Sequence, residues 1–455
     1  MTTIHAAQAL TREGWRDSVR LQVQAGRIVS LQAGVPAEAG DEKHAILVPA
    51  LGNLHSHAFQ RAMAGLAEVS GDSADNFWSW REAMYRLAHR MNPEQLEAVA
   101  AQAYVEMLES GFTRVGEFHY LHHDANGAPY SDVGEMSARI FAAAEASGIG
   151  LTLLPVFYAH STFGGAAPKP AQHRFLNTLE SYETLLQRCR TLASRLNTAV
   201  VGVAPHSLRA VTPEELVAVA KLAGKAPVHI HVAEQVKEVE ECLAWSGQRP
   251  VEWLLNHAPV AANWCLVHAT HVTPKEVQGI AESRAVVGLC PVTEANLGDG
   301  IFPVSQLLEH RGRFGIGTDS NVHISVAAEL SLLEYSQRLA ERARNVVRKE
   351  KHSTGRAIIE LALAGGAQAL GGGEGTIAEG HAADFVSLNE QHTALANALA
   401  SRTANALLDA WIFASAGHVV DSVWVAGTKL VSQGRHVARE HVARGFVKAM
   451  KELHS

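Results

Sequence analysis

The chain has 455 residues, of which 47% are hydrophobic and 19% are charged, and its formal net charge at pH 7 is −7. This length exceeds that of one small core and the composition is ordinary for a globular protein, so we expect two structural units without extensive disorder. The acidic balance and the lack of a long Lys/Arg run argue against nucleic acid or an anionic membrane as partner, and favour a small molecule.

Two further features concern location and redox state. No apolar stretch reaches about 18 residues, and the first residues do not combine a basic start with an apolar core, so we expect a cytoplasmic protein. The four cysteines are widely scattered and form no C-x-x-C pair, which indicates reduced core residues. They are Cys189, Cys242, Cys265 and Cys290.

The two ends of the chain share a pattern of short alternating strands. Residues 1–48 alternate apolar and polar side chains, with Gly26 at a turn, and segments 383–388 and 421–434 repeat the pattern. Neither end is long enough to bury a core alone. We therefore predict one small β-sandwich domain built from residues 1–48 and 374–455, with the ends side by side.

The middle of the chain, residues 49–373, alternates short apolar strands with longer amphipathic stretches, which is typical of parallel β/α units. Eight such units predict an α/β fold, a (β/α)8 barrel, whose chemistry gathers where the strands end. The predicted strands span 46–52, 112–118, 151–158, 200–205, 228–232, 265–269, 285–290 and 314–319.

Histidine or aspartate stands at the end of four of these strands. His55 and His57 follow the first strand and face the same way, His231 lies in the fifth, His268 in the sixth, and Asp319 ends the eighth. Each signal is weak alone, since an isolated H-x-H is common and a strand-end aspartate often caps a helix. Together they predict that these side chains meet, with His55, His57, His231 and Asp319 as ligands of a metal.

Three imidazoles and one carboxylate suit Zn²⁺, which keeps a position open for water in catalytic sites. Iron and manganese remain possible on ligand type. The fourth strand region offers no lysine that could become a bridging carbamate, so we expect one divalent metal per chain.

A second set of polar residues follows the ends of the first, second and fourth strands. Gln60 and Arg81 lie in a long predicted loop after the first strand, Tyr120 follows the second, and His206 and Arg209 follow the fourth. Singly, each is explained as well by a surface arginine or a packing tyrosine. Two arginines among aromatic side chains favour a dianionic small molecule, because guanidinium binds carboxylate through two hydrogen bonds.

The motifs together resemble the amidohydrolase superfamily, specifically its deaminase branch, over nearly the whole length. The carrying residues are H-x-H after the first strand, H-x-x-E after the fifth, His268, Asp319 and the segment EGHAADFV at 379–386. Within that branch the chain is most similar to the formimidoylglutamate deiminases of histidine degradation. The motifs are HSHAFQR (55–61), NFWSWR (76–81), GFTRVGEFHY (111–120), APHSLR (204–209) and HVAEQ (231–235).

This resemblance implies particular roles. A water activated by the metal would attack an sp² carbon that bears nitrogen, converting N-formimidoyl-L-glutamate to N-formyl-L-glutamate and ammonia. Asp319 would take the proton of the water, His268 would orient and polarise that water, and Glu234 would protonate the departing nitrogen. Gln60, Arg81, Tyr120, His206 and Arg209 would hold the glutamate portion. The resemblance also implies a homodimer.

Other interpretations stay open at this point. The same scaffold could serve a purine, pyrimidine or triazine deaminase, and a metal-free interaction protein is a more distant possibility. Residues 161–175, a predicted loop rich in Gly, Ala and Pro, could close over the substrate, with Gly164 and Gly165 as hinges.

Overall fold

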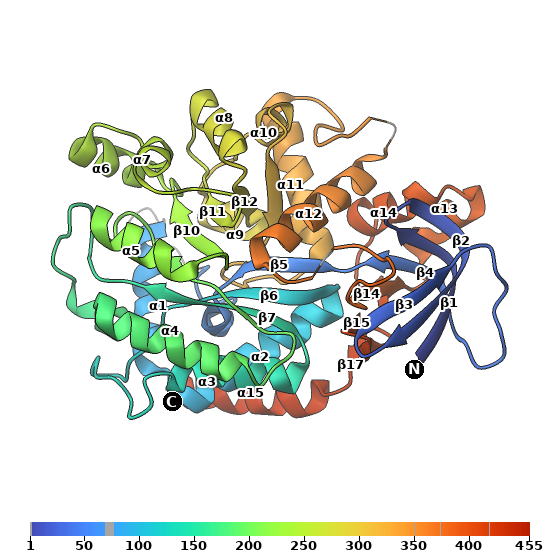
Figure 1. Ribbon diagram of the computed structural model, residues 1–455, viewed down its shortest axis with the longest axis horizontal. Helices are drawn as coiled ribbons and strands as arrows, with labels where there is room; N and C mark the ends of the chain where they lie inside the picture. Colours follow the sequence, from blue (N-terminus) through green and yellow to red (C-terminus); the bar gives the residue numbers. More distant parts are fainter. Residues whose placement is uncertain (1, 69–76, 351, 374, 418) are drawn as a thin grey trace.

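The computed structural model describes residues 2–68, 77–350, 352–373, 375–417 and 419–455. In Figure 1 a barrel of parallel strands, ringed by helices, occupies one side of the molecule, and a separate sheet made from both ends of the chain lies beside it. The predicted fold class, a (β/α)8 barrel with a small β-domain from the termini, is confirmed.

The barrel strands follow one another around the ring in chain order and pair in parallel. Short bridges join the two parts of this sheet, Val203 with Val228 on one side and Ser56 with Asp319 on the other. The strands are β5 Leu51–Ser56, β6 Phe112–His119, β7 Gly150–Phe157, β8 Val200–Val201, β9 Ala204–Pro205, β10 Val228–Val232, β11 Trp264–His268, β12 Val286–Leu289 and β13 Arg313–Ile316.

The surrounding helices have clear local start signals. Asn92 and Thr212 each cap a helix that has proline at its first position, and in each case a Gln or Glu three residues on completes a capping box. These helices are α1 Phe77–Arg90, α2 Pro93–Ser110, α3 Glu135–Ser147, α4 Leu179–Ala193, α5 Pro213–Ala223, α6 Val236–Ser246, α7 Pro250–His257, α8 Pro274–Ser283, α9 Pro291–Leu297, α10 Val304–Glu309, α11 Val326–Glu341 and α12 Thr354–Leu370, with short 3-10 helices η1 Ala58–Met63 and η2 Pro170–Phe175.

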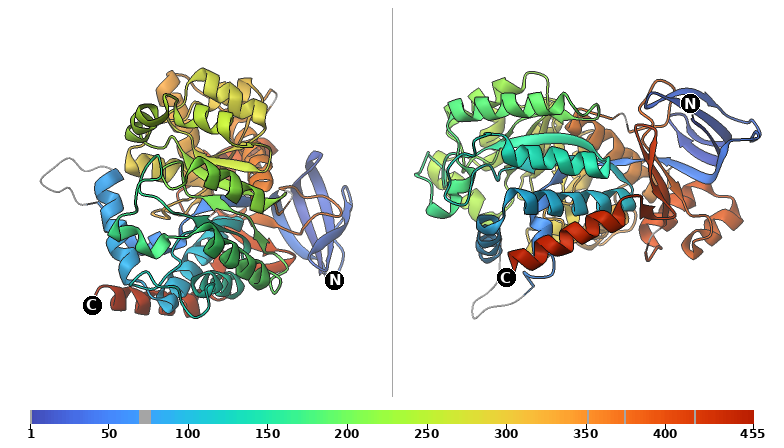
Figure 2. Two further views of the ribbon diagram at one scale, coloured as in Figure 1. Left: turned by 60° about the vertical axis from the view of Figure 1, so that its left-hand side comes forward. Right: turned by 90° about the horizontal axis from the view of Figure 1, so that it is seen from below.

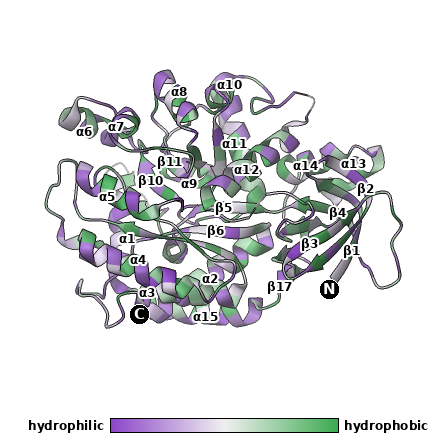
Figure 3. Ribbon diagram, viewed as in Figure 1, coloured by the Kyte–Doolittle hydropathy of each residue, from purple (hydrophilic) through white to green (hydrophobic). Residues whose placement is uncertain are grey.

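Hydropathy is distributed as this layering requires. In Figure 3 outer helices such as α4, α8 and α15 carry both hydrophilic and hydrophobic colours, as amphipathic helices with one face on the strands do. Every residue of β6, β7, β10 and β11 is buried, because parallel strands are covered on both faces. None of the described helices combines the length and hydropathy that a bilayer span requires.

The predicted first strand, residues 46–52, is wrong in its boundaries. Residues up to Pro49 belong to β4 Glu42–Pro49 of the small sheet, and the first barrel strand is β5, which begins at Leu51. Both strands are apolar and stand almost end to end, so alternation and length could not separate them. The chain crosses from one unit to the other at Ala50.

The small sheet has eight strands in the order β17-β16-β15-β14-β4-β1-β2-β3, so strands from both terminal segments pair within one sheet, as predicted. The prediction that the two chain ends lie side by side is wrong, because the last helix carries the C-terminus along the barrel, away from the N-terminus (Figure 1). Some of the apolar side chains of the small sheet, among them Ile4, Leu21, Phe385 and Trp424, form a core of their own, while others, such as Val48, join the core of the barrel. The strands not yet given are β1 Thr2–Thr11, β2 Gly14–Gln24, β3 Arg27–Gln32, β14 Phe385–Leu388, β15 Val420–Val425, β16 Thr428–Ser432 and β17 Arg435–His436.

The C-terminal region also contains helices that the β-sandwich prediction left out. η3 Thr393–Leu395, α13 Ala396–Ser401 and α14 Ala404–Phe413 lie between β14 and β15, and α15 Arg439–Leu453 follows β17. In Figure 2, α15 runs alongside α2 on the outside of the barrel, where Arg439 pairs with Glu109. The domain boundaries at 48 and 374 stay predictions.

Candidate active site

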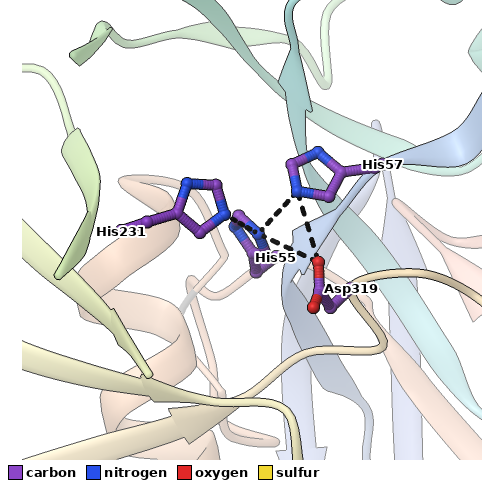
Figure 4. Close-up of side chains that lie close together, drawn as sticks. All are labelled: His55, His57, His231 and Asp319. Carbon is purple, nitrogen blue, oxygen red and sulfur yellow. Dashed lines mark hydrogen bonds and ion pairs between the residues drawn. The ribbon is translucent and has the colours of Figure 1, made fainter. Parts of the chain in front are cut away.

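The four predicted metal ligands come together at the C-terminal end of the barrel. His55 lies in β5, His57 follows that strand, His231 lies in β10 and Asp319 follows β13. Their ligand atoms lie within 4.8 Å of one another, and all four residues are buried. Figure 4 shows the three rings and the carboxylate turned towards one another.

The separations in this cluster fit a cation. The Nε2 atom of His55 lies 3.2 Å from that of His57 and 3.1 Å from that of His231, while Asp319 Oδ1 lies 3.2 Å from His57 Nε2 and 3.4 Å from His55 Nε2. Ligands about 2.0–2.1 Å from a tetrahedral zinc ion lie about 3.3–3.4 Å apart. The described residues thus provide a donor set of the right size and type for a divalent metal.

In His57 and His231 the proton lies on Nδ1, which points away from the cluster, so Nε2, which points into the cluster, is free to bind a metal. His57 Nδ1 donates to the Phe118 carbonyl at 2.9 Å, and His231 Nδ1 donates to the His206 carbonyl at 3.0 Å. Burial lowers the pKa of His55, His57 and His231, which keeps the rings neutral. Facing lone pairs at such distances repel one another unless a cation lies between them.

The backbone around Asp319 is held in an unusual conformation. Its φ of 45° is left-handed, and its N–H donates to the His55 carbonyl at 2.9 Å while its own carbonyl accepts from His57 N–H at 2.9 Å. The buried amide of Asn321 donates to Ser56 Oγ and to the His57 and Asp319 carbonyls. These bonds tie β5 to the end of β13 and fix three of the four ligands relative to one another.

Glu234 and His268, the other predicted catalytic residues, lie beside this cluster. His268 Nε2 is 3.7 Å from Glu234 Oε1 and 3.8 Å from Asp319 Oδ2. Burial raises the pKa of Glu234 to about 7, so its carboxyl group can carry a proton near neutral pH. Burial would lower the pKa of His268, but Glu234, Glu294 and Asp319 outweigh it and raise that pKa to about 10.

Two residues near His268 were not singled out from the sequence. Glu294, in α9, accepts from His268 Nδ1 at 3.2 Å and from Cys290 N–H at 2.9 Å, which orients the imidazole. Cys290, expected only as a core residue, is buried with its sulfur within 4.8 Å of ligand atoms of His268 and Asp319. All four cysteines are buried and unpaired.

A pocket opens in front of the metal cluster and contains every predicted substrate-binding residue. Its empty space, including the part open to solvent at the mouth, is about 660 Å³. Gln60 and Arg81 lie in η1 and α1 rather than in an open loop, and residues 69–76 are outside the described part of the chain. The lining includes Gln60, Arg81, Tyr120, His206, Arg209, His231, Glu234, His268 and Asp319.

The two arginines lie on one aromatic side chain. The guanidinium carbon of Arg81 is 4.4 Å from the Trp78 ring centre and that of Arg209 is 5.8 Å from it. Arg209 is only 6% exposed, and its Nε has no hydrogen-bond partner among the described residues. Two cations close together, one with a free buried donor, form a site for anionic groups.

Hydroxyl and amide groups complete the wall. Gln60 Nε2 donates to Tyr120 Oη at 2.8 Å. Tyr158, which the sequence did not single out, accepts from Gln172 Nε2 at 2.7 Å, and its ring lies 4.7 Å from that of His206. The Tyr158 hydroxyl also interacts with the Tyr85 hydroxyl, so it has two polar neighbours in the wall of the pocket.

The segment 161–175, predicted as a covering loop, lies at the pocket edge. Ser161 and Phe175 line the pocket, and Phe163 stacks on Trp245 of α6 with ring centres 5.6 Å apart. Its last part, η2, is anchored by the buried guanidinium of Arg174, which donates to the Met91 and His123 carbonyls at 2.9 Å. Closure of this loop over a substrate stays a prediction.

Comparisons with known proteins agree over the whole chain. The model of the amidohydrolase family matches residues 46–430, and that of the N-terminal domain of formimidoylglutamate deiminase HutF matches residues 1–45. A formimidoylglutamate deiminase from Pseudomonas aeruginosa is 49% identical over 456 residues, covering 100% of both chains.

Solved structures give the same result. An amidohydrolase from Brucella melitensis superposes with a TM-score of 0.97 at 55% identity, covering 100% of both chains. A zinc-bound adenosine deaminase from Xanthomonas campestris shares the fold at 22% identity with a TM-score of 0.80, over 100% of this chain and 98% of the other. The chain belongs to the amidohydrolase family and, within it, to the formimidoylglutamate deiminases.

Proposed function

We propose that this protein hydrolyses N-formimidoyl-L-glutamate to N-formyl-L-glutamate and ammonia, a step of histidine degradation. The observation that carries the proposal is the pocket itself, in which a buried His/His/His/Asp group faces two arginines. One end of such a pocket suits a hydrolysable C–N centre, and the other suits carboxylates. The full-length similarity to a formimidoylglutamate deiminase supports the same substrate.

The metal-holding role is assigned to His55, His57, His231 and Asp319, and zinc is the proposed ion because three neutral imidazoles and one carboxylate suit it. When bound, such an ion lowers the pKa of water and so supplies a nucleophile near neutral pH. In the reaction the oxygen of water becomes the formyl oxygen, and the C–N bond to the terminal nitrogen breaks.

The protein side chains move the protons. Asp319 is proposed to accept a proton from the attacking water, because its Oδ2 faces His268 and is free of the contact that Oδ1 makes with His57. His268, held by Glu294, points Nε2 into the same space and orients the water. Glu234 is proposed to give its proton to the terminal nitrogen, which leaves as ammonia.

The other end of the pocket is proposed to hold the glutamate portion of the substrate. Arg81 and Arg209 are proposed to hold the two carboxylates of the glutamate portion, with hydrogen bonds from Gln60, Tyr120 and His206. The described part of the pocket is lined by aromatic rings, which exclude water and strengthen these ion pairs. A linear dianion is favoured over a nucleobase, because a neutral ring offers no negative charge to the buried Arg209 or to the partly buried Arg81.

Two finer points are part of the same proposal. The protein is proposed to act as a homodimer in the cytoplasm, on family resemblance and on its place in amino-acid breakdown. Light scattering of the purified protein and fractionation of expressing cells test these points separately from the activity.

The experiment that tests the function compares ammonia release from formimidoylglutamate, formimidoylaspartate, guanine and S-adenosylhomocysteine, with metal analysis of the same sample. We expect fastest turnover of formimidoylglutamate and about one divalent ion per chain. Faster turnover of guanine or S-adenosylhomocysteine would contradict the substrate assignment, and full activity without metal would contradict the mechanism.

A further inference from the structure

A buried carboxylate outside the predicted site contacts both halves of the pocket. Glu238 lies in the first turn of α6, has no exposed surface, and is four residues beyond Glu234. Of the other acidic residues of this helix, Glu240 is exposed and Glu241 is partly buried. A fully buried carboxylate needs polar partners. Those of Glu238 are two backbone N–H groups in the turn that carries Glu234, and the guanidinium of Arg209.

The first contact is with the loop that carries Glu234. Glu238 Oε1 accepts from Ala233 N–H at 2.9 Å and Oε2 accepts from Glu234 N–H at 3.3 Å. Ala233 has φ of 52°, a left-handed conformation that an alanine adopts only when its surroundings impose it. These two bonds hold the turn between β10 and α6, and therefore the direction of the Glu234 side chain.

The second contact is with Arg209. Its Nη2 lies 3.8 Å from Glu238 Oε2, which is an ion pair without a short hydrogen bond. Arg209 also interacts electrostatically with Glu234, and both carboxylates raise its pKa against the effect of burial. Two carboxylates therefore interact with Arg209, and only one of them, Glu234, has a proposed role in proton transfer.

We propose that Glu238 is a positioning residue for both halves of the reaction. Its carboxylate fixes the Glu234 turn through two backbone hydrogen bonds, and it serves as the resting counterion of Arg209. Without that charge Arg209 turns towards Glu234, so that the substrate loses its cation and the leaving nitrogen loses its proton donor. This inference rests on the proposed function, since it assigns Glu234 and Arg209 their roles.

The two contacts can be separated by substitution. Glu238→Gln keeps one oxygen to accept from the backbone but removes the charge, whereas Glu238→Ala removes both. We expect KM for formimidoylglutamate to rise about tenfold in both variants, because both lose the counterion of Arg209. The kcat value should fall only a few-fold in Glu238→Gln but about 100-fold in Glu238→Ala, because the turn then loses both acceptors.

A double-mutant cycle identifies the path of the KM effect. In an Arg209→Met background, adding Glu238→Gln should leave KM within about twofold of the Arg209→Met value, since the residue through which the charge acts is gone. Glu240→Gln, on the exposed face of the same helix, is the matched control and should leave kcat and KM unchanged. Metal content and melting temperature, measured for every variant, show whether each is folded.

The outcome that overturns the proposal is equally specific. If Glu238→Gln and Glu238→Ala lower kcat and raise KM in the same ratio, and the KM change adds fully to that of Arg209→Met, Glu238 is only a structural residue. Calorimetric binding of L-glutamate gives a readout without turnover, in which Glu238→Gln should weaken binding about tenfold. Inactive wild-type enzyme would instead contradict the proposed function, so the two failures are distinguishable.

Discussion

The surroundings of the metal cluster and the turn after α12, at opposite ends of the barrel, reach left-handed backbone conformations in different ways. Beside the cluster at the C-terminal end, five left-handed positions are not glycine: Ala233, His268, Ala269, Asp319 and Asn321 have φ between 45° and 65°. At the N-terminal end the turn after α12 uses Gly371, Gly373 and Gly375, with φ of 62°, 79° and 59°. Glycine adopts such angles without steric cost, whereas other residues need hydrogen bonds to hold them.

This difference separates function from stability. At the C-terminal end, hydrogen bonds from the backbone to Glu238 and from Asn321 to the backbone stabilise the left-handed residues, and many titratable groups are buried there. The N-terminal end is filled by apolar side chains such as Leu54 and Leu370, with Arg114 as a buried cation beside the glycines. Changes at the first end should therefore reduce activity, and changes at the second should reduce the free energy of unfolding.

Removal of the metal should have the largest effect. Chelation is expected to abolish ammonia release, and added zinc should restore it, because the proposed nucleophile depends on the ion. The melting temperature should also fall, since the facing imidazoles and the carboxylate lose their shared partner. A metal-free sample that runs at the full rate would show that the C-terminal end works in another way.

Replacement of the proton donor should come next. Glu234→Gln is nearly isosteric but cannot give up a proton, so kcat should fall by about 100- to 10,000-fold while the metal content stays the same. The free energy of unfolding should fall little or not at all, because the change removes a buried acid. Near-normal kcat would mean that a different group protonates the leaving nitrogen.

Removal of the arginine that pairs with a substrate carboxylate should reduce activity somewhat less. Arg209→Met should cost about 2 to 5 kcal/mol in kcat/KM for formimidoylglutamate, because one substrate carboxylate then lacks its cation. The measurement is steady-state kinetics, with hydrolysis of a substrate without carboxylates as the control. If formimidoylglutamate is used as well as before, the carboxylate site lies elsewhere.

A substitution at the N-terminal end of the barrel should reduce the free energy of unfolding and leave the activity unchanged. Arg114 is buried, and its Nη1 donates to the Leu151 carbonyl at 3.3 Å and to Thr152 Oγ1 at 3.4 Å. Arg114→Met should lower the free energy of unfolding by about 1–3 kcal/mol, because these acceptors and nearby Asp384 lose a charged partner. The values of kcat and KM should not change, and a large loss of activity in the folded variant would contradict the separation of the two ends.

A partly exposed ion pair at the surface should have the smallest effect, and that effect should depend on pH. Asp132 pairs with Arg188, and this hydrogen bonding lowers the pKa of Asp132 below its usual 3.8. Because the pKa of Asp132 is lower in the folded protein than in the unfolded chain, the ionised carboxylate stabilises the fold above pH 3.8. This stabilisation is lost as the pH falls through the folded-state pKa. Asp132→Asn should therefore cost less than about 1 kcal/mol at pH 7 and nothing once Asp132 is protonated, as denaturant melts at two pH values will show.

Much of the fold could be predicted from local pattern, and the errors have physical causes. Six of the seven strands from 112–118 onwards lie within one residue of their predicted ends, apart from a break between β8 and β9. The seventh, β13, ends at Ile316, three residues before its predicted end at 319. The first strand failed because two apolar strands of different sheets stand almost end to end, with only Ala50 between them. Arg81 was expected in a loop, but the segment from Phe77 onwards is helical.

The sequence by itself determined the order of the barrel strands and the side chains that gather at the end of the barrel. The carboxyl ends of parallel strands converge whatever connects them, so residues such as His55 and His231 had to meet once the strands were placed. Only the tertiary structure decided what surrounds them. Arg209 lies against Trp78 and beside Glu238, because α1, α6 and the segment after β9 pack together there. Contacts between elements so distant in the chain depend on packing, which leaves no periodic pattern in the sequence.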